Sequence, residues 1–199
     1  MTLIKQIFCL FLFLTPALLY CQQQINLPLT KDSTIVYEQV IESPFSKDLL
    51  FLSAKEWIID YYDTPSNVVV EENKDEGLLI IKGTVKDIFP FNRVGENTFH
   101  TYETDFEQFY TLRIDIKDSK YRYIITLNNI KIFVTTSTPF GDVENWVDKS
   151  SKDFIRNYFN DSTNYKMKVE KANKIHEEII RLIRGLNDRL KTKPTISDF

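Results

Sequence analysis

Cysteine, histidine and glycine are scarce in this chain of 199 residues, and their scarcity excludes several kinds of functional site. The two cysteines, Cys9 and Cys21, lie near the N-terminus, and the two histidines are His100 and His176. A zinc site made of cysteine and histidine is therefore excluded from the body of the chain. The five glycines form no phosphate-binding, dinucleotide-binding or nucleophile-elbow motif, and no HExxH motif occurs. We therefore expect no catalytic site, no metal and no cofactor.

The first 21 residues have the layout of a secretory signal peptide. Lys5 is their only charged residue, residues 7–20 are almost wholly apolar, and three glutamines follow Cys21. The apolar run is too short to span a bilayer comfortably, and no later stretch approaches the roughly 20 apolar residues that a spanning helix needs. We expect a soluble protein, made of residues 22–199, that is exported to the periplasm or the extracellular space.

The end of this segment allows two interpretations. Cleavage between Cys21 and Gln22 would leave a mature chain without any thiol. Alternatively, Cys21 could be the lipidated N-terminus of a lipoprotein, because Leu18, Leu19 and Tyr20 precede it. We favour cleavage, because the position before a lipidated cysteine normally holds a small residue and Tyr20 is bulky.

The net charge of −3 argues against binding to nucleic acid or to an anionic membrane. Basic residues nevertheless crowd the C-terminal segment: Lys166, Lys168, Lys171, Lys174, Arg181, Arg184, Arg189, Lys191 and Lys193. Acidic residues are interspersed among them, so we expect a solvated helix face with local ion pairs. His176 lies in the same segment, and we expect it to be solvated too.

Residues 106–129 predict a β-hairpin whose register can be read directly. A two-residue loop at Asp118 and Ser119 aligns apolar residues on one face: Ile116 with Tyr121, Ile114 with Tyr123, Leu112 with Ile125, and Tyr110 with Leu127. The opposite face pairs Asp115 with Arg122 and Thr111 with Thr126. This alternation is typical of an antiparallel pair with one buried face. The tyrosines of the KYRY motif are therefore assigned to the core rather than to a ligand site.

The other elements follow from apolar periodicity. The predicted order is a strand at 33–42, a helix from about 46 to 62, strands at 68–71 and 78–85, the hairpin continued to 134, and a helix at about 165–191. Residues 87–104 are expected to be irregular, and residues 137–164 to be a long connection with a short helix near 153–159. Two helices on one face of an antiparallel sheet give an α+β, two-layer domain of the helix-grip type.

Both long helices carry local signals. For the first, Phe45, Ser46 and Leu50 predict a capping hydroxyl with a hydrophobic staple. For the second, an apolar stripe comprises Ile175, Ile179, Leu182, Leu186 and Leu190, widened by Ile180 and Ile183. Gly185 interrupts this helix, so we expect a close approach to the sheet there.

The polar loop 72–77 resembles a calcium loop only superficially. Asn73 and Asp75 alternate before Gly77, but the acidic first position and the downstream bidentate glutamate of an EF-hand are missing. We therefore interpret this segment as a turn between two strands.

Three segments occur in a characteristic order: DLLFLSAKEWIIDYY at 48–62, VVVEENKDEGLLIIKGT at 68–84, and LRIDIKDSKYRYIITLNNI at 112–130. Over Thr34–Ile130 the chain resembles a secreted bacterial domain of unknown function that is described as having a TBP-like fold. Ser119 stands where that family usually has glycine. The resemblance implies a helix-packed sheet in exported proteins of Gram-negative bacteria, and it implies no activity. A TBP-like fold is not by itself an indication of DNA binding.

An aromatic-rich surface is the strongest candidate for recognition. Its proposed members, in a segment without clear periodicity, are Phe89, Phe91, Phe99, His100 and Tyr102. A second cluster in the later connection contains Trp146, Phe154, Tyr158 and Phe159. Aromatic residues in irregular segments either fold back on the core or line a contact surface, and both possibilities stay open here.

The sequence favours a binding protein whose partner is a protein or an apolar small molecule. The alternative is a hydrolase that uses paired carboxylates, for which the candidates are Asp60/Asp63, Glu71/Glu72 and Asp142/Glu144. A third possibility is a structural component of the cell envelope.

Overall fold

The computed structural model describes residues 27–88, 100–150, 153 and 165–192. Its elements are β1 (Val36–Glu42), α2 (Lys47–Tyr61), α3 (Pro65–Val68), β2 (Val69–Asn73), β3 (Leu78–Ile88), β4 (His100–Lys117), β5 (Lys120–Thr138), β6 (Gly141–Lys149) and α5 (Tyr165–Lys191). The predicted signal peptide and its cleavage site at Cys21 and Gln22 lie outside the described residues.

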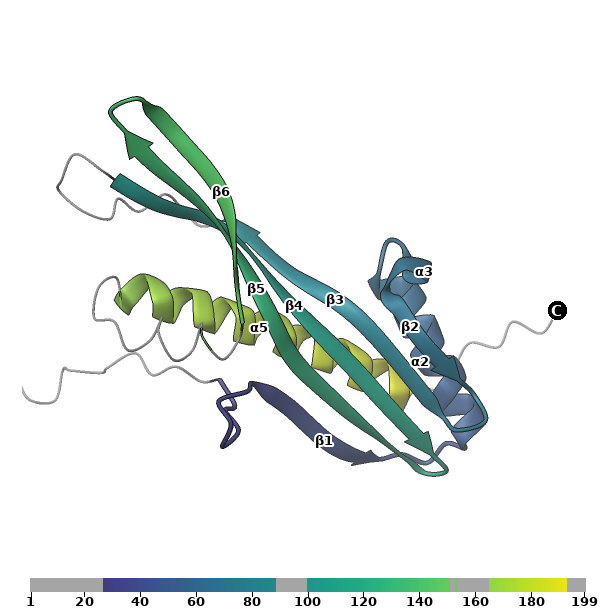
Figure 1. The fold of residues 1–199 in the computed structure, drawn as a ribbon. Coiled ribbons are helices and arrows are strands. Elements are labelled where there is room, and N and C mark those ends of the chain that lie inside the picture. Colours follow the sequence, from purple (N-terminus) through teal and green to yellow (C-terminus); the bar gives the residue numbers. More distant parts are fainter. Residues whose placement is uncertain (1–26, 89–99, 151–152, 154–164, 193–199) are drawn as a thin grey trace, which may run out of the picture.

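The strands form one antiparallel sheet, and the two long helices pack against one of its faces (Figure 1). The strand order is β1-β5-β4-β3-β2, and β6 pairs with the distal half of β5, beyond the part that pairs with β1. The predicted two-layer α+β architecture is therefore confirmed. No described helix is both long and apolar enough to cross a membrane.

The predicted hairpin register is confirmed at every pair. Ile116 faces Tyr121 and Ile114 faces Tyr123, and the remaining predicted apolar and polar pairs are also cross-strand partners. The apolar members are at most 5 % exposed and pack in one core cluster with α2 and α5. Burial of this single face fixes the register, since a slip of one residue would turn the apolar side chains to solvent.

The turn of this hairpin also caps helix α2, which the sequence did not reveal. Ser46 occupies the N-cap position, but its side chain makes no capping hydrogen bond, so the predicted hydroxyl cap is wrong. Instead, the Lys47 N–H donates to Asp118 Oδ1 at 2.9 Å, and the Ser119 N–H donates to the Phe45 carbonyl at 3.1 Å. A carboxylate at a helix N-terminus is favourable whichever part of the chain supplies it.

Three expectations about chain path are corrected. Residues 137–164 were expected to be a connection, but residues 141–149 form β6. The irregular segment at 87–104 is shorter than expected, because β3 runs to Ile88 and β4 begins at His100. Between α2 and β2 the chain forms the short helix α3. The short helix expected near 153–159 lies almost wholly outside the described residues.

Helix α5 has the predicted bounds and apolar stripe, and all five stripe residues are buried. Gly185, however, faces helix α2 rather than the sheet. A Cβ added there would lie 3.2 Å from Trp57 Nε1. The glycine therefore lets the two helices approach each other.

The polar residues of α5 are less solvated than expected. Lys168 and Lys171 are 5 % and 0 % exposed, although Glu178 does form the expected ion pairs with Lys174 and Arg181. His176 is half-buried, and its Nδ1 lies 3.0 Å from the Tyr37 hydroxyl. Long lysine side chains can bury their aliphatic stems along apolar surface, so a charge pattern alone does not predict exposure.

Gly83 on β3 is required by the tyrosine that lies across it. Tyr110 on β4 is its direct cross-strand partner, and a Cβ on residue 83 would overlap the Tyr110 ring end and hydroxyl. The Tyr110 hydroxyl reaches Tyr62 at 2.8 Å, which links the sheet to the end of α2. Burial is the main cause that raises the pKa of Tyr62 to about 12 and the pKa of Tyr110 still further.

We predict that Gly83→Ala lowers the free energy of unfolding by about 1–3 kcal/mol, because the new methyl group overpacks the Tyr110 site. Urea denaturation measures the change. In a Tyr110→Leu background the same substitution should cost much less. An equal cost in both backgrounds would show that the overlap with Tyr110 is not the cause.

We also predict that stability falls as the pH rises above about 10. An unfolded tyrosine loses its proton near 10, whereas folded Tyr62 keeps its proton up to about 12, so the unfolded state binds fewer protons in this window. One such tyrosine contributes a slope of about 1.4 kcal/mol per pH unit. Urea denaturation across this range should give a shallower slope for Tyr62→Phe, and an unchanged slope would contradict the assignment.

Candidate functional site

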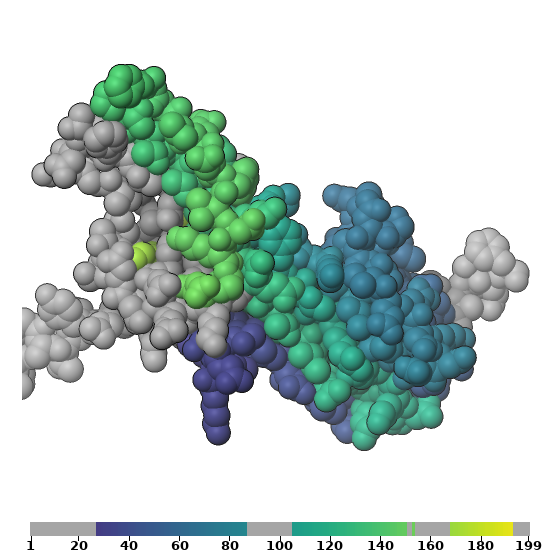
Figure 2. Space-filling view, in the orientation of Figure 1, coloured from purple at the N-terminus to yellow at the C-terminus, as the bar shows by residue number. Residues whose placement is uncertain are grey.

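The ends of β4, β5 and β6 extend beyond the helices as a projecting arm (Figure 1). We define the arm as residues 100–104 and 133–147, which include the β5–β6 turn. In the space-filling view its β5–β6 tip stands away from the rest of the sheet (Figure 2). The arm is the part of the described chain where strands continue without a helix beneath them.

Two irregularities in the β4–β5 ladder separate the arm from the body of the sheet. The register shifts between Gln108 and Tyr110, and again between Glu103 and Phe106. At the first shift, the buried Gln108 amide donates to the carbonyls of Phe109, Asn128 and Asn129 at 2.8–3.2 Å. Bulges bend strands and increase their twist, and Gln108 satisfies carbonyl groups that the regular ladder leaves free.

Four of the ten exposed large apolar side chains in the described part of the chain lie together on the arm. Phe140, in the β5–β6 turn, is 99 % exposed, and on β6 Val143, Trp146 and Val147 are 37–50 % exposed. Trp146 packs on Phe133 of β5, with ring centroids 5.2 Å apart. Exposed apolar residues gathered in one place are typical of an interaction surface.

Two of the predicted recognition residues, His100 and Tyr102, also lie on the arm. The backbone of His100 pairs with Ser137, and that of Tyr102 pairs with Thr135, so both belong to β4 rather than to an irregular segment. Trp146, from the second predicted aromatic cluster, lies on the same arm. Phe89, Phe91, Phe99, Phe154, Tyr158 and Phe159 lie outside the described residues.

Sequence reasoning missed the exposed residues of β6 and of the turn before it. Phe140, Val143 and Val147 were not singled out, because a strand that is solvated on both faces has no apolar alternation. The only available signal was the paired β-branched and aromatic residues around the Pro139–Gly141 turn.

Comparison with known proteins identifies the family of the segment from β1 to the first part of β5. Residues 37–132 match the family model for a domain of unknown function with TBP-like fold, DUF4468. This chain carries a DUF4468 domain. The matched range agrees closely with the predicted resemblance over Thr34–Ile130, and it ends before β6 and α5.

Solved structures show the same fold over most of the chain. A TBP-like protein from Parabacteroides distasonis ATCC 8503 has a TM-score of 0.55 and 16 % identity, covering 84 % of this chain and 98 % of that one. A DUF4468 family protein from Bacteroides ovatus ATCC 8483 also has a TM-score of 0.55, with 9 % identity and coverages of 84 % and 94 %. No curated protein matches the sequence.

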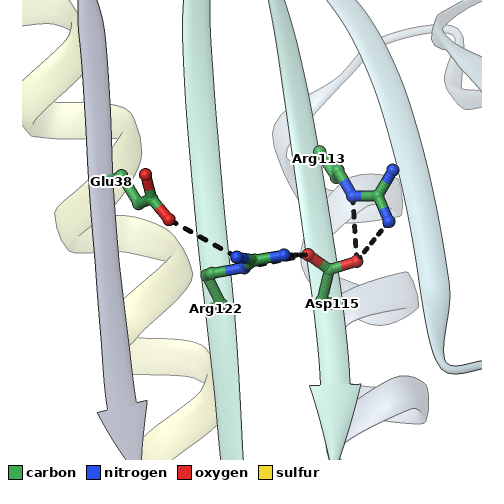
Figure 3. A network of polar contacts seen from close by, with 4 residues as sticks. All are labelled: Glu38, Arg113, Asp115 and Arg122. Atoms are coloured by element: carbon green, nitrogen blue, oxygen red, sulfur yellow. Dashed lines mark hydrogen bonds and ion pairs between the residues drawn. The ribbon is translucent and has the colours of Figure 1, made fainter.

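On the face of the DUF4468 sheet away from its core, a row of charged residues links three strands (Figure 3). Asp115 accepts hydrogen bonds from Arg113 at 2.9 Å and from Arg122 at 2.7 Å, and Glu38 lies 3.5 Å from Arg122. Partial burial would raise the pKa of the Asp115 carboxyl, but the hydrogen bonds from both arginines outweigh it and hold that pKa below its usual value. Asp115 is therefore a charged structural group and is poorly suited to proton transfer.

The candidate carboxylate pairs lie on or beside three different elements, and the third lies outside the DUF4468 match. Asp60 and Asp63 are exposed at the end of α2, Glu71 and Glu72 lie on β2, and the Asp142/Glu144 pair lies on β6. Glu72 is paired with Lys55 at 2.7 Å, and Asp142 accepts a hydrogen bond from Ser137. Within the described part of the chain, no three His, Cys, Asp or Glu residues are grouped as they would be around a metal ion.

Proposed function

We propose that this protein is an exported, non-catalytic binding module that recognises an extended segment of a partner protein with its arm. The observation that carries the proposal is the meeting of exposed apolar residues on one projecting element, with Phe140 99 % exposed at its tip. Aromatic residues at such positions supply large contact area for recognition.

The outer edge of β6 supports a particular mode of binding. Within the described residues, β6 pairs only with β5, so the backbone groups along its other edge have no strand partner. An extended peptide can add a strand to such an edge, where backbone hydrogen bonds provide affinity and side chains provide specificity.

The charge of β6 favours a basic partner segment. Asp142, Glu144 and Asp148 give this strand three carboxylates, against one lysine at position 149. Along β6, Asp142, Glu144 and Asp148 share one face, and Val143 and Val147 lie on the other. A segment that alternates basic and apolar residues would place its basic side chains on the carboxylates and its apolar side chains against Val143 and Val147. The carboxylate-dependent hydrolase has less support, because only one of its candidate carboxylates, Glu72, lines the pocket beneath α3.

A peptide-display selection tests this proposal. The exported chain should enrich peptides that alternate Lys or Arg with apolar residues, and Phe140→Ser with Trp146→Ser should weaken their binding by about tenfold or more, as expected for central aromatic contacts. Fluorescence anisotropy measures the affinities. Salt should weaken binding to the original protein more than binding to Asp142→Asn with Glu144→Gln, which removes two of the charges.

The matched control is Val40→Ser on β1, which removes a side chain that is 55 % exposed but lies off the arm. It should bind the selected peptides as the original protein does. Recognition by the arm would be contradicted if the control weakened peptide binding as much as the arm variant does. It would also be contradicted if the selection enriched peptides without basic residues. If the protein is instead a structural component of the cell envelope, the peptide-display selection should enrich no peptide.

Export itself has a direct test. We expect the intact mass of the protein purified from the culture or the periplasm to correspond to residues 22–199, because the apolar segment ends at Cys21. A diacylglyceryl adduct on Cys21 would instead establish a lipoprotein.

A further inference from the structure

A pocket lies at the other end of the molecule from the arm, beneath the short helix α3. Its volume is about 260 Å³. Helix α2 contributes Lys55, Ile58 and Ile59, and the remaining lining residues are Pro65, Ser66, Val69, Glu72 and Leu79. In Figure 1 these elements lie at the right of the sheet, whereas the arm is at its upper left.

The floor of the pocket is apolar and well ordered by the core. Ile58 and Leu79 are 2 % and 0 % exposed and belong to the main core cluster. Ile59 stands at the opening and is 60 % exposed. The volume is below the range typical of drug-sized ligands, so the pocket suits a smaller molecule with an aliphatic body.

A β-bulge in β2 gives the pocket its carboxylate, Glu72. The pairing of β2 with β3 shifts between Val69 and Glu71. In a regular strand, residues 69, 71 and 73 would share a face, but here Val69 and Glu72 both line the pocket. The bulge therefore places a carboxylate beside an apolar wall.

Opposite this carboxylate stands a cation from α2. Lys55 Nζ lies 2.7 Å from Glu72 Oε1, and the two side chains are 42 % and 38 % exposed. A singly charged ligand that approached one of these groups would also meet the opposite charge of the other, so attraction and repulsion would nearly cancel. A ligand with both charges could lie alongside the pair with each charge opposite its counterpart.

We infer that this pocket binds a small zwitterion with an aliphatic body, of the kind represented by a free branched-chain amino acid. The ligand carboxylate faces Lys55, the ligand ammonium faces Glu72, and the aliphatic side chain lies against Ile59 and Val69, above the buried Ile58 and Leu79. The net charge of the site is unchanged by binding, and neither protein charge loses its partner. This site does not depend on recognition by the arm.

The test is a matched series of ligands that share the isobutyl group of leucine and differ in their charged groups. L-Leucine is the zwitterion, 4-methylpentanoate the anion, 3-methylbutylamine the cation and 3-methyl-1-butanol the uncharged member. Amide chemical shifts in the NMR spectrum of the full exported chain locate and measure binding. We expect L-leucine to shift amides of residues around the pocket and to bind about tenfold more tightly than the other three, a difference of about 1.4 kcal/mol.

Two charge variants then invert the preference. Lys55→Met keeps the apolar stem and leaves Glu72, so 3-methylbutylamine should become the tightest ligand. Glu72→Gln leaves Lys55, so 4-methylpentanoate should become the tightest. The control is Lys86→Met, which breaks an exposed ion pair of similar length, Lys86–Glu107 at 2.6 Å, on the sheet away from the pocket, and it should leave the preference for leucine unchanged.

The inference is overturned if L-leucine causes no shifts around the pocket. It is equally overturned if the alcohol binds as tightly as leucine in the original protein and in both charge variants, since the site would then select only for apolar bulk. Phe140→Ser should retain leucine binding whether or not the arm recognises peptides, so failure of one proposal is separable from failure of the other.

Discussion

The β4–β5 ladder is the constraint on which the rest of the structure depends. These two strands are the central pair of the sheet, and each serves as the template for a neighbour: β5 for β1 and β6, and β4 for β3. Their apolar pairs form the surface on which α2 and α5 pack. Because neighbouring side chains along a strand point to opposite faces, a single register decides which residues become core and which become surface. The turn of the same ladder even provides the cap of α2 through Asp118.

Both candidate sites lie where strand pairing departs from this regular pattern. Register shifts in the β4–β5 ladder precede the arm, and a register shift in β2 brings the carboxylate of Glu72 to the pocket. Regular pairing with a buried face leaves little freedom for recognition, because its side chains are committed to packing. A bulge redirects a strand or a side chain at small structural cost, and so it can present groups to a partner. The charged row around Asp115, which follows the regular pattern, is satisfied within the sheet.

The parts of the fold that the sequence predicted well are those with one buried face. The hairpin at 106–129 and helix α5 both carry a strict apolar period, and the structure has them at the predicted register and bounds. Strand β6 has no such period, because all but its last residue are exposed, and it was expected to be a connection. The candidate recognition surface was predicted only as two separate aromatic segments. Because β4 and β6 both pair with β5, residues from both aromatic segments lie on one arm. Local sequence does not encode this pairing.

The sequence by itself determined the family of the domain and the pairing of its central strands, because both depend on residues that are adjacent or regularly spaced. Tertiary structure alone decided contacts between distant segments. The Asp118 cap on Lys47 spans 71 positions, Gly83 is needed because Tyr110 crosses it, and Lys55 meets Glu72 from another element. Such contacts depend on how elements that are distant in sequence pack together. A pattern along the chain specifies which face of a helix or strand is buried, but not which other element packs against that face.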